Sequence, residues 1–315
     1  MSQGKADRLS GACPFPLRGR LSAHALDEAF CAGTEGVVRG CCVSESFSGK
    51  TVIVTGGGRG VGRGIALGFA SAGANVMLAA RTLSYAEETK ADIEAAGGVA
   101  DIFGIDVKDH AQCSALIAAT AKRFGGIDII VHCAADIAHG GVGHVSDEAM
   151  EAGFASIAKA AWWLLDAGRP YLAKASDGGR FIAIGSVNGT VSIVPNMTAY
   201  GMAKAALDAF VRGAAGDVVA DGITVNAVNP GLIASARAMA VLGDEGLATY
   251  AATVPVGRAG TPEDVAHACL FLASARSSYI TGTSIKMDGG SSVAVANGRN
   301  DLLQNKLKQQ REIQI

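Results

Sequence analysis

The sequence predicts an α/β fold built on a single Rossmann-like doubly wound parallel sheet, in three layers with helices on both faces. Short apolar runs rich in β-branched residues alternate with longer segments of helical periodicity from about residue 50 onward. Many of the 42 glycines fall where a predicted strand gives way to a helix. Hydrophobic residues make up 49% of the 315-residue chain, which is ample for one large core.

Strands and helices alternate strictly along the chain. We expect strands at residues 51–55, 75–80, 99–105, 127–131, 180–184, 223–228 and 284–287. We expect helices at residues 61–72, 84–96, 109–124, 146–173, 198–220 and 262–273. Thr261 and Pro262 predict the start of the last helix, as its N-cap and first residue. Because a helix follows each strand, neighbouring strands are expected to run parallel.

Three segments are expected. Residues 1–47, with scattered Gly, Pro and Ser, read as a poorly ordered N-terminal extension. Residues 48–290 form the Rossmann domain, with a variable substrate loop at about 232–257. Residues 291–315 are polar and rich in Gln and Lys, which predicts a tail or a peripheral helix.

Charge and composition exclude several classes of protein. The net charge is −2 and the basic residues form no long cluster, so we expect no nucleic-acid partner. No apolar run approaches the ~20 residues that span a bilayer, so no membrane partner is expected. The seven cysteines show no zinc-site spacing, which indicates reduced thiols and no bound metal. We therefore expect a cytoplasmic protein that acts on a small molecule.

A glycine-rich turn follows the first predicted strand. Residues 55–62 read TGGGRGVG, which fits T-G-x-x-x-G-x-G with Gly56, Gly60 and Gly62 at the key positions. Glycine lets the backbone turn sharply and approach a pyrophosphate, and the helix that opens near Val61 offers free N–H groups. Such a turn alone also suits an ordinary tight loop. Its place after the first strand favours dinucleotide binding.

The end of the second strand indicates which dinucleotide is bound. An acidic residue there accepts the ribose hydroxyls of NAD. This strand ends in Ala80 and Arg81 instead, and Arg59 lies within the glycine turn. Two guanidinium groups near the adenosine ribose suit a 2′-phosphate, because arginine binds phosphate bidentately. The pattern favours NADP(H) over NAD(H), while the alternative is that both arginines are solvated surface charges.

A second motif lies on the predicted helix at 198–220. Tyr200 and Lys204 are four residues apart, so they share one face of the helix. A lysine ammonium near a phenol lowers a pKa that starts near ~10, as a general acid/base for a carbonyl/alcohol couple requires. Ser186 follows the strand at 180–184 and is placed to hydrogen-bond a substrate oxygen. The Y-x-x-x-K spacing alone is common in helices.

Taken in order, the glycine turn, Ser186, Tyr200 and Lys204 closely resemble the short-chain dehydrogenase/reductase family. The resemblance runs from about residue 49 to residue 290. Further matching segments lie at residues 106–107, 229–231, 255–258, 262–264, 271–274 and 288–290. The family's fold is the one that the alternation of elements predicts.

The resemblance implies hydride transfer at the nicotinamide C4. Tyr200 would donate a proton to a carbonyl or remove one from an alcohol, Ser186 would orient the oxygen, and Lys204 would bind the nicotinamide ribose. The implied cofactor-binding residues are Gly56, Arg59, Gly60, Val61, Gly62, Arg81, Asp106, Val107, Ala134, Tyr200, Lys204, Pro230, Gly231 and Ile233. The family also implies a homotetramer or homodimer.

One departure from the family concerns its proton relay. An Asn in the fourth helix usually holds a water there, and that position falls at Ile157. An isoleucine side chain cannot hold a water. Ser156 and Asn188 are nearby substitutes, and the alternative is that the relay is absent.

Two further departures lie next to strands. The usual Asn-Asn-Ala-Gly after the fourth strand reads His132-Cys133-Ala134-Ala135. His132, Asp136, His139 and His144 suggest a metal site, but their spacing fits none well. Ser186 and Tyr200 stand one residue further apart than is usual, which leaves Ser192 as a weak competitor.

The leading hypothesis is an NADP(H)-dependent carbonyl reductase or alcohol dehydrogenase that interconverts a ketone and a secondary alcohol. The alternatives are a protein of this fold that mainly binds cofactor, and a non-redox lyase or cyclase. Ile157 supports the alternatives, and the ordered set of Ser186, Tyr200 and Lys204 favours the first. Apolar residues in the loop at 232–257 indicate a medium-sized substrate, although core packing explains them about as well.

Overall fold

The computed structural model describes residues 46–192 and 194–293, which contain a seven-stranded parallel sheet. The strands are β1 (Thr51–Thr55), β2 (Asn75–Ala80), β3 (Val99–Gly104), β4 (Ile129–His132), β5 (Arg180–Ile184), β6 (Thr224–Pro230) and β7 (Ser284–Met287). Their order across the sheet is β3-β2-β1-β4-β5-β6-β7. The predicted class, a doubly wound α/β sheet with helices on both faces, is confirmed.

The strand order reverses between β1 and β4. β1 pairs with β2 on one side and with β4 on the other, where Thr55 is level with His132. In open parallel sheets, ligands bind in the crevice outside the carboxyl ends of the strands at such a reversal. The topology therefore places a ligand site at the ends of β1 and β4.

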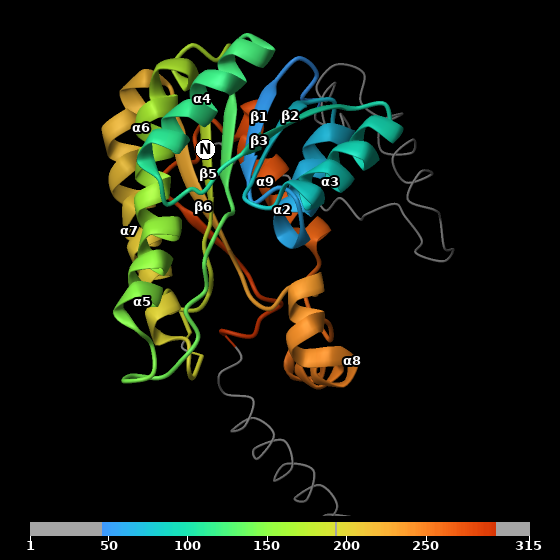
Figure 1. Cartoon of the computed structure of the whole chain (residues 1–315), viewed down its shortest axis with the longest axis vertical. Coiled ribbons are helices and arrows are strands. Elements are labelled where there is room, and N and C mark those ends of the chain that lie inside the picture. The colour runs from blue at the N-terminus through green and yellow to red at the C-terminus, as the bar shows by residue number, and fades with distance from the viewer. Residues whose placement is uncertain (1–45, 193, 294–315) are drawn as a thin grey trace, which may run out of the picture. The chain divides into compact units, whose positions relative to one another are not determined.

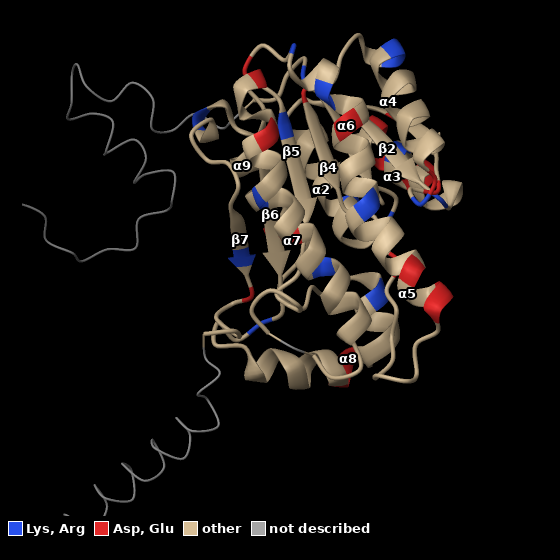
Figure 2. Ribbon diagram, turned by 90° about the vertical axis from the view of Figure 1, so that its left-hand side faces the viewer, with Lys and Arg blue, Asp and Glu red and all other residues tan. Residues whose placement is uncertain are grey.

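Helices cover both faces of the sheet (Figure 1). On one face lie α2 (Gly60–Ser71), α3 (Leu83–Ala95) and α9 (Pro262–Ala273); on the other lie α4 (His110–Phe124), α6 (Ala160–Leu172) and α7 (Thr198–Val218). Val52 and Val54 of β1 belong to the core under α2, α3 and α9, and Ile53 belongs to the core under α4, α6 and α7, as alternation along a strand requires. Strands β1, β4 and β6 carry no Lys, Arg, Asp or Glu. The charged residues of the described chain lie mainly on the helices and loops (Figure 2).

The long helix predicted at 146–173 is interrupted by a π-helical turn. α5 (Asp147–Phe154) leads into this turn (Ala155–Lys159), and α6 follows it. A π-helical turn changes which backbone carbonyls are bonded within the helix, and such turns are frequent at functional sites. Sequence periodicity did not reveal it, because all three pieces are helical.

The predicted substrate loop contains a helix that the prediction lacks. α8 (Ala236–Thr253) bends at Gly243, where φ is +65°, and none of its residues is buried. It lies beyond the carboxyl ends of β6 and β7 (Figures 1 and 2). Most other boundaries agree with the prediction within two residues, and Thr261 caps α9 as expected, with Asp264 completing a capping box.

The predicted extension and tail fall almost entirely on residues 1–45 and 294–315, which lie outside the described residues. Phe47 is 4% exposed and packs edge-on against Phe69, with the ring centroids 5.3 Å apart. Within the described part of the chain, no helix combines the length and the apolar character needed to cross a membrane.

Candidate active site

The residues proposed for the site gather at the carboxyl edge of the sheet. In strand order they are Gly56 after β1, Arg81 after β2, Asp106 and Val107 after β3, Ala134 after β4, Ser186 after β5, and Pro230 and Gly231 at the end of β6. Tyr200 and Lys204 lie in the first two turns of α7. The parallel sheet brings them together because every strand ends at the same edge.

The glycine turn is closed by contacts that exclude a side chain. Gly56 has a φ of +70°, and a Cβ there would lie 3.1 Å from the backbone nitrogen of Ala134. A Cβ on Gly62 would lie 2.1 Å from the carbonyl oxygen of Gly56. At the start of α2, the N-cap residue Arg59 makes no side-chain cap bond, and a Cβ on Gly60 would come no closer than 3.6 Å to its nearest neighbour. A helix start without a side-chain cap is suited to a phosphate.

Arg59 and Arg81 have different partners. The Arg59 guanidinium lies over the Tyr85 ring, 5.2 Å from its centroid. Arg81 reaches Asp136, with its Nη2 3.3 Å from Oδ1 and its Nη1 3.4 Å from Oδ2. The expectation of two arginines near the ribose did not include this carboxylate, because Asp136 comes from the loop after β4.

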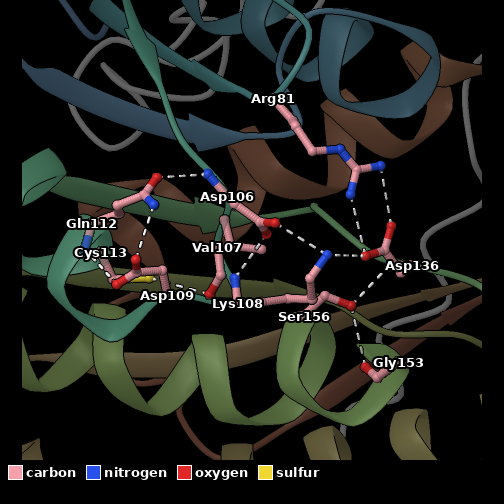
Figure 3. A network of polar contacts seen from close by, with 10 residues as sticks. All are labelled: Arg81, Asp106, Val107, Lys108, Asp109, Gln112, Cys113, Asp136, Gly153 and Ser156. Carbon is pink, nitrogen blue, oxygen red and sulfur yellow. Dashed lines mark hydrogen bonds and ion pairs between the residues drawn. The ribbon is translucent and has the colours of Figure 1, made fainter. Parts of the chain in front are cut away.

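Asp136 and Lys108 form the centre of a polar network (Figure 3). Lys108 Nζ donates to Asp136 Oδ2 at 2.9 Å and lies 3.1 Å from Asp106 Oδ2. Burial acts to raise the pKa of Asp136, but the hydrogen bonds and charges of Lys108 and Arg81 outweigh it and hold that pKa below its ordinary value. Asp136 is therefore ionised at neutral pH.

Ser186, Tyr200 and Lys204 converge at the end of β5. Lys204 is 3% exposed, and its Nζ donates to the Ile184 carbonyl oxygen at 2.6 Å and lies 5.6 Å from the Tyr200 ring centroid. The Ser186 hydroxyl accepts the Asn188 N–H at 3.1 Å. The three side chains thus form one cluster, with the phenol held between a hydroxyl and a buried ammonium group.

Burial dominates the protonation of this cluster. It raises the pKa of Tyr200 to about 12, against a lowering by the hydrogen bond with Ser186. It also lowers the pKa of Lys204 to about 8. The expectation that Lys204 lowers the pKa of Tyr200 is wrong for this structure, because the ammonium group is directed at the Ile184 carbonyl and the phenol is desolvated.

His132 joins β1, β4 and the π-helical turn. Thr55 Oγ1 accepts the N–H groups of Cys133 and Ala134, so its own hydrogen is donated to His132 Nδ1 at 2.9 Å. The other ring nitrogen, Nε2, therefore carries the proton and donates to the Ile157 carbonyl oxygen at 3.1 Å. The side chain of Ile157 is fully buried, but its carbonyl serves as an acceptor within the site.

The two substitutes considered for the missing relay Asn are both engaged elsewhere. Ser156 Oγ accepts the Asp136 N–H at 2.9 Å and donates to the Gly153 carbonyl at 3.2 Å. Asn188 accepts the Val194 N–H at 3.1 Å and so closes the loop that precedes α7. Ser156 positions the loop after β4, and Asn188 positions the loop after β5.

Comparisons with known proteins identify the family. The family model described as enoyl-(acyl carrier protein) reductase matches residues 56–292. An uncharacterized oxidoreductase of Mycobacterium tuberculosis is 36% identical over 76% of this chain and 91% of its own length. The chain belongs to the short-chain dehydrogenase/reductase family. Galactitol 2-dehydrogenase of Agrobacterium fabrum is 32% identical over 78% of this chain and 98% of its own length.

A solved structure gives the same result for the fold of this short-chain dehydrogenase/reductase. It comes from Beutenbergia cavernae, is provisionally described as an NAD(P)-dependent gluconate 5-dehydrogenase, and contains NADP at low occupancy. It is 32% identical, with a TM-score of 0.73, and covers 79% of this chain and 99% of that chain. The protein is thus an oxidoreductase of a family that binds a nicotinamide cofactor.

Three supporting residues of this short-chain dehydrogenase/reductase, Asp208, Thr190 and Ser284, escaped the sequence analysis. Asp208 lies one turn beyond Lys204 on α7 and accepts hydrogen bonds from Ser284 at 2.5 Å and Asn229 at 3.4 Å. Asn229 also donates to Thr190 at 3.4 Å, and Thr190 donates to the Ser186 carbonyl at 2.7 Å. The i, i+4 spacing from Lys204 was the available signal for Asp208.

Two other predicted residues lie where their side chains serve the fold. Ile233 is 7% exposed and packs close to Gly260, and its carbonyl oxygen accepts the Ser235 N–H. His132 uses both ring nitrogens in protein hydrogen bonds. Among residues 46–192 and 194–293, no group of three or more His, Cys, Asp or Glu side chains is placed to hold a metal ion.

Proposed function

We propose that the protein is an NADP(H)-dependent carbonyl reductase or alcohol dehydrogenase that interconverts a ketone and a secondary alcohol. The observation that carries this proposal is the cluster of Ser186, Tyr200 and Lys204 at the carboxyl edge of the sheet, beside the glycine turn. A cofactor-binding role without turnover would not need this acid/base group.

The residues present fit a nicotinamide dinucleotide. The uncapped start of α2 suits its pyrophosphate, with Gly60, Val61 and Gly62 as the binding residues. Asp106 and Val107 would hold the adenine, while Ala134, Pro230 and Gly231 would line the path to the nicotinamide. When bound, the cofactor supplies or accepts the hydride.

Tyr200 acts as the general acid/base. A phenol with a pKa of about 12 is protonated at neutral pH, so it is ready to donate a proton to a carbonyl oxygen. Ser186, whose hydroxyl accepts the Asn188 N–H and whose carbonyl accepts from Thr190, orients that oxygen. Lys204 binds the nicotinamide ribose and provides a positive charge beside Tyr200.

An apolar substrate fits the loops around this cluster. Val142, Val191, Val194, Val241 and Leu242 are between 39% and 89% exposed, and they lie on the loops after β4 and β5 and on α8. Gly140 and Met197 form an isolated parallel β-bridge, which places the loop after β4 beside the loop after β5. We infer a medium-sized ketone or secondary alcohol with an apolar body.

NADP(H) is favoured by charge. No acidic residue follows β2, and Arg59 and Arg81 lie near the place where the adenosine ribose would bind. The structure from Beutenbergia cavernae contains NADP, which is consistent with this choice.

The test is oxidation of NADPH and NADH with a panel of ketones of increasing size, measured on wild type, Tyr200→Phe and Tyr279→Phe. Tyr279 is fully exposed and serves as the matched control. Tyr200→Phe should lower kcat by roughly 10²- to 10⁴-fold, while Tyr279→Phe should leave it unchanged. Turnover that survives in Tyr200→Phe would refute the mechanism. Tight binding of NADPH without turnover of any ketone would favour the cofactor-binding alternative.

We also propose that the protein is a homodimer or homotetramer. Trp162 on α6 is 59% exposed, and its ring lies 6.3 Å from that of Phe210 on α7, so two adjacent helices present an apolar face. Light scattering should show an oligomer that Trp162→Glu weakens.

A further inference from the structure

Asp136 provides a carboxylate close to the place where the end of β2 lacks one. Its two oxygens face the two terminal nitrogens of Arg81 at 3.3 and 3.4 Å. In sequence the two residues are far apart, on the loops after β2 and β4, and only the strand order β2-β1-β4 brings them together. Arg81 is one of the two residues, with Arg59, to which the proposed function assigns the 2′-phosphate of NADP.

The position of Asp136 is fixed from two sides. Its backbone N–H donates to the hydroxyl of Ser156, which is 2% exposed, and its Oδ2 accepts from Lys108 Nζ at 2.9 Å (Figure 3). Lys108 is in turn paired with Asp106. The carboxylate is therefore a fixed part of the site, whereas Arg81 is a long side chain with 61% exposure that can turn to another partner.

The charges in this network balance. Arg81 and Lys108 carry two positive charges, and Asp106 and Asp136 carry two negative ones. A 2′-phosphate that binds Arg81 must compete with Asp136 for the guanidinium and must also approach its negative charge. Unphosphorylated ribose faces neither cost. Arg59 is not part of this competition, since it lies over Tyr85.

We propose that Asp136 is a specificity-determining residue, which holds Arg81 and so weakens the preference for a 2′-phosphorylated adenosine ribose over an unphosphorylated one. The inference rests on the proposed function, because it assumes that Arg81 reads the 2′-phosphate. It predicts that the wild-type preference for NADP(H) is smaller than an unpaired Arg81 would give.

The experiment measures calorimetric dissociation constants of the full-length protein for two fragments, adenosine 2′,5′-bisphosphate and adenosine 5′-monophosphate. Asp136→Asn should bind the bisphosphate about fivefold more tightly, because an exposed ion pair contributes on this scale. Its dissociation constant for the monophosphate should be unchanged. Arg81→Ala should weaken the binding of the bisphosphate. In the Arg81→Ala background, Asp136→Asn should lose most of its effect, because the two residues are coupled.

Asp101→Asn is the matched control. Asp101 also pairs with one lysine and one arginine, Lys90 and Arg123, and its side chain is 33% exposed against 31% for Asp136. It lies within β3 rather than at the strand ends, and its substitution should change neither constant.

The outcomes separate the two claims. If Arg81→Ala weakens the bisphosphate but Asp136→Asn does not tighten it, the role of Asp136 is refuted and the cofactor proposal stands. A looser bisphosphate complex in Asp136→Asn would also refute it, because Asp136 would then position Arg81 for the phosphate. If Arg81→Ala leaves both constants unchanged, the assignment of the 2′-phosphate to Arg81 fails, and the inference fails with it.

Discussion

His132 Nε2 donates a hydrogen bond to the carbonyl oxygen of Ile157, at 3.1 Å, and so ties strand β4 to the π-helical turn between α5 and α6. The same imidazole accepts from Thr55 at the end of β1. One buried side chain thus links three elements around the site. The bond from Thr55 requires the neutral ring with its proton on Nε2, since a doubly protonated ring could not accept at Nδ1.

The first prediction concerns acid stability. Burial, and secondarily the charge of Lys204, lowers the pKa of His132 from 6.5 to about 4 in the folded protein. Between these values the unfolded chain binds more protons than the folded one, so the free energy of unfolding falls as the pH falls from 6.5 to about 4. Over this pH range, His132 should lower the free energy of unfolding by roughly 3 kcal/mol in total. Urea unfolding across this pH range should show it.

The control for this prediction is a histidine at the surface. His132→Asn should flatten the pH dependence below 6.5, while the same change at the exposed His139 should leave it in place. Nitrogen NMR of the imidazole at about pH 5.5 gives a second measurement, and should report a neutral ring with hydrogen on Nε2. A doubly protonated ring at that pH would contradict the assignment.

The hydrogen bonds that join β1 to β4 around His132 should depend on Thr55. Its buried hydroxyl accepts two backbone N–H groups and donates to His132. Thr55→Val keeps the volume but leaves those partners unsatisfied, so the free energy of unfolding should fall by about 2–4 kcal/mol. Thr55→Ser keeps the hydroxyl and should cost only about 1 kcal/mol for the lost methyl group. Equal losses in the two variants would show that packing, not hydrogen bonding, matters there.

Much of the fold was predictable, because hydrophobic periodicity and turn residues are local signals. The strands at 51–55, 75–80, 180–184 and 284–287 have the predicted bounds. The π-helical turn was not predictable, since it continues the helical pattern of its neighbours, and its contact with His132 comes from another strand. Helix α8 was also missed, because its residues are not buried and show little apolar periodicity.

In the candidate site too, features that depend on local sequence were predictable and features that depend on tertiary contacts were not. The motifs placed Ser186, Tyr200 and Lys204 on the correct elements, and the sheet brings them together. The pKa of Tyr200 went against the expectation, because a four-residue spacing says nothing of burial or of where the ammonium group points. The partnership of Asp136 with Arg81 depends on the order of the strands, which a single sequence does not display.

The choice between Ser186 and Ser192 can be tested directly. Ser186 is hydrogen-bonded at both its hydroxyl and its carbonyl and interacts with Tyr200, whereas Ser192 contributes a backbone carbonyl to the Gly189 N–H. Ser186→Ala should lower kcat/KM for a ketone by about 10²-fold, as loss of an oxygen-orienting donor does. Ser192→Ala should change it by less than about twofold. The reverse order would move the catalytic serine to residue 192.

The glycine turn yields the last prediction. A Cβ at Gly62 would lie 2.1 Å from the Gly56 carbonyl oxygen, which is backbone and can move only by opening the turn. Gly62→Ala should therefore lower the free energy of unfolding by about 1–3 kcal/mol, and it should weaken NADPH binding because α2 no longer begins at the pyrophosphate position. Gly213→Ala, at an exposed position of α7 with no atom within 4 Å of the new Cβ, should instead stabilise by about 0.5–1 kcal/mol. Thermal unfolding with and without NADPH measures both effects, and an unchanged NADPH-induced shift in Gly62→Ala would show that this turn does not hold the cofactor.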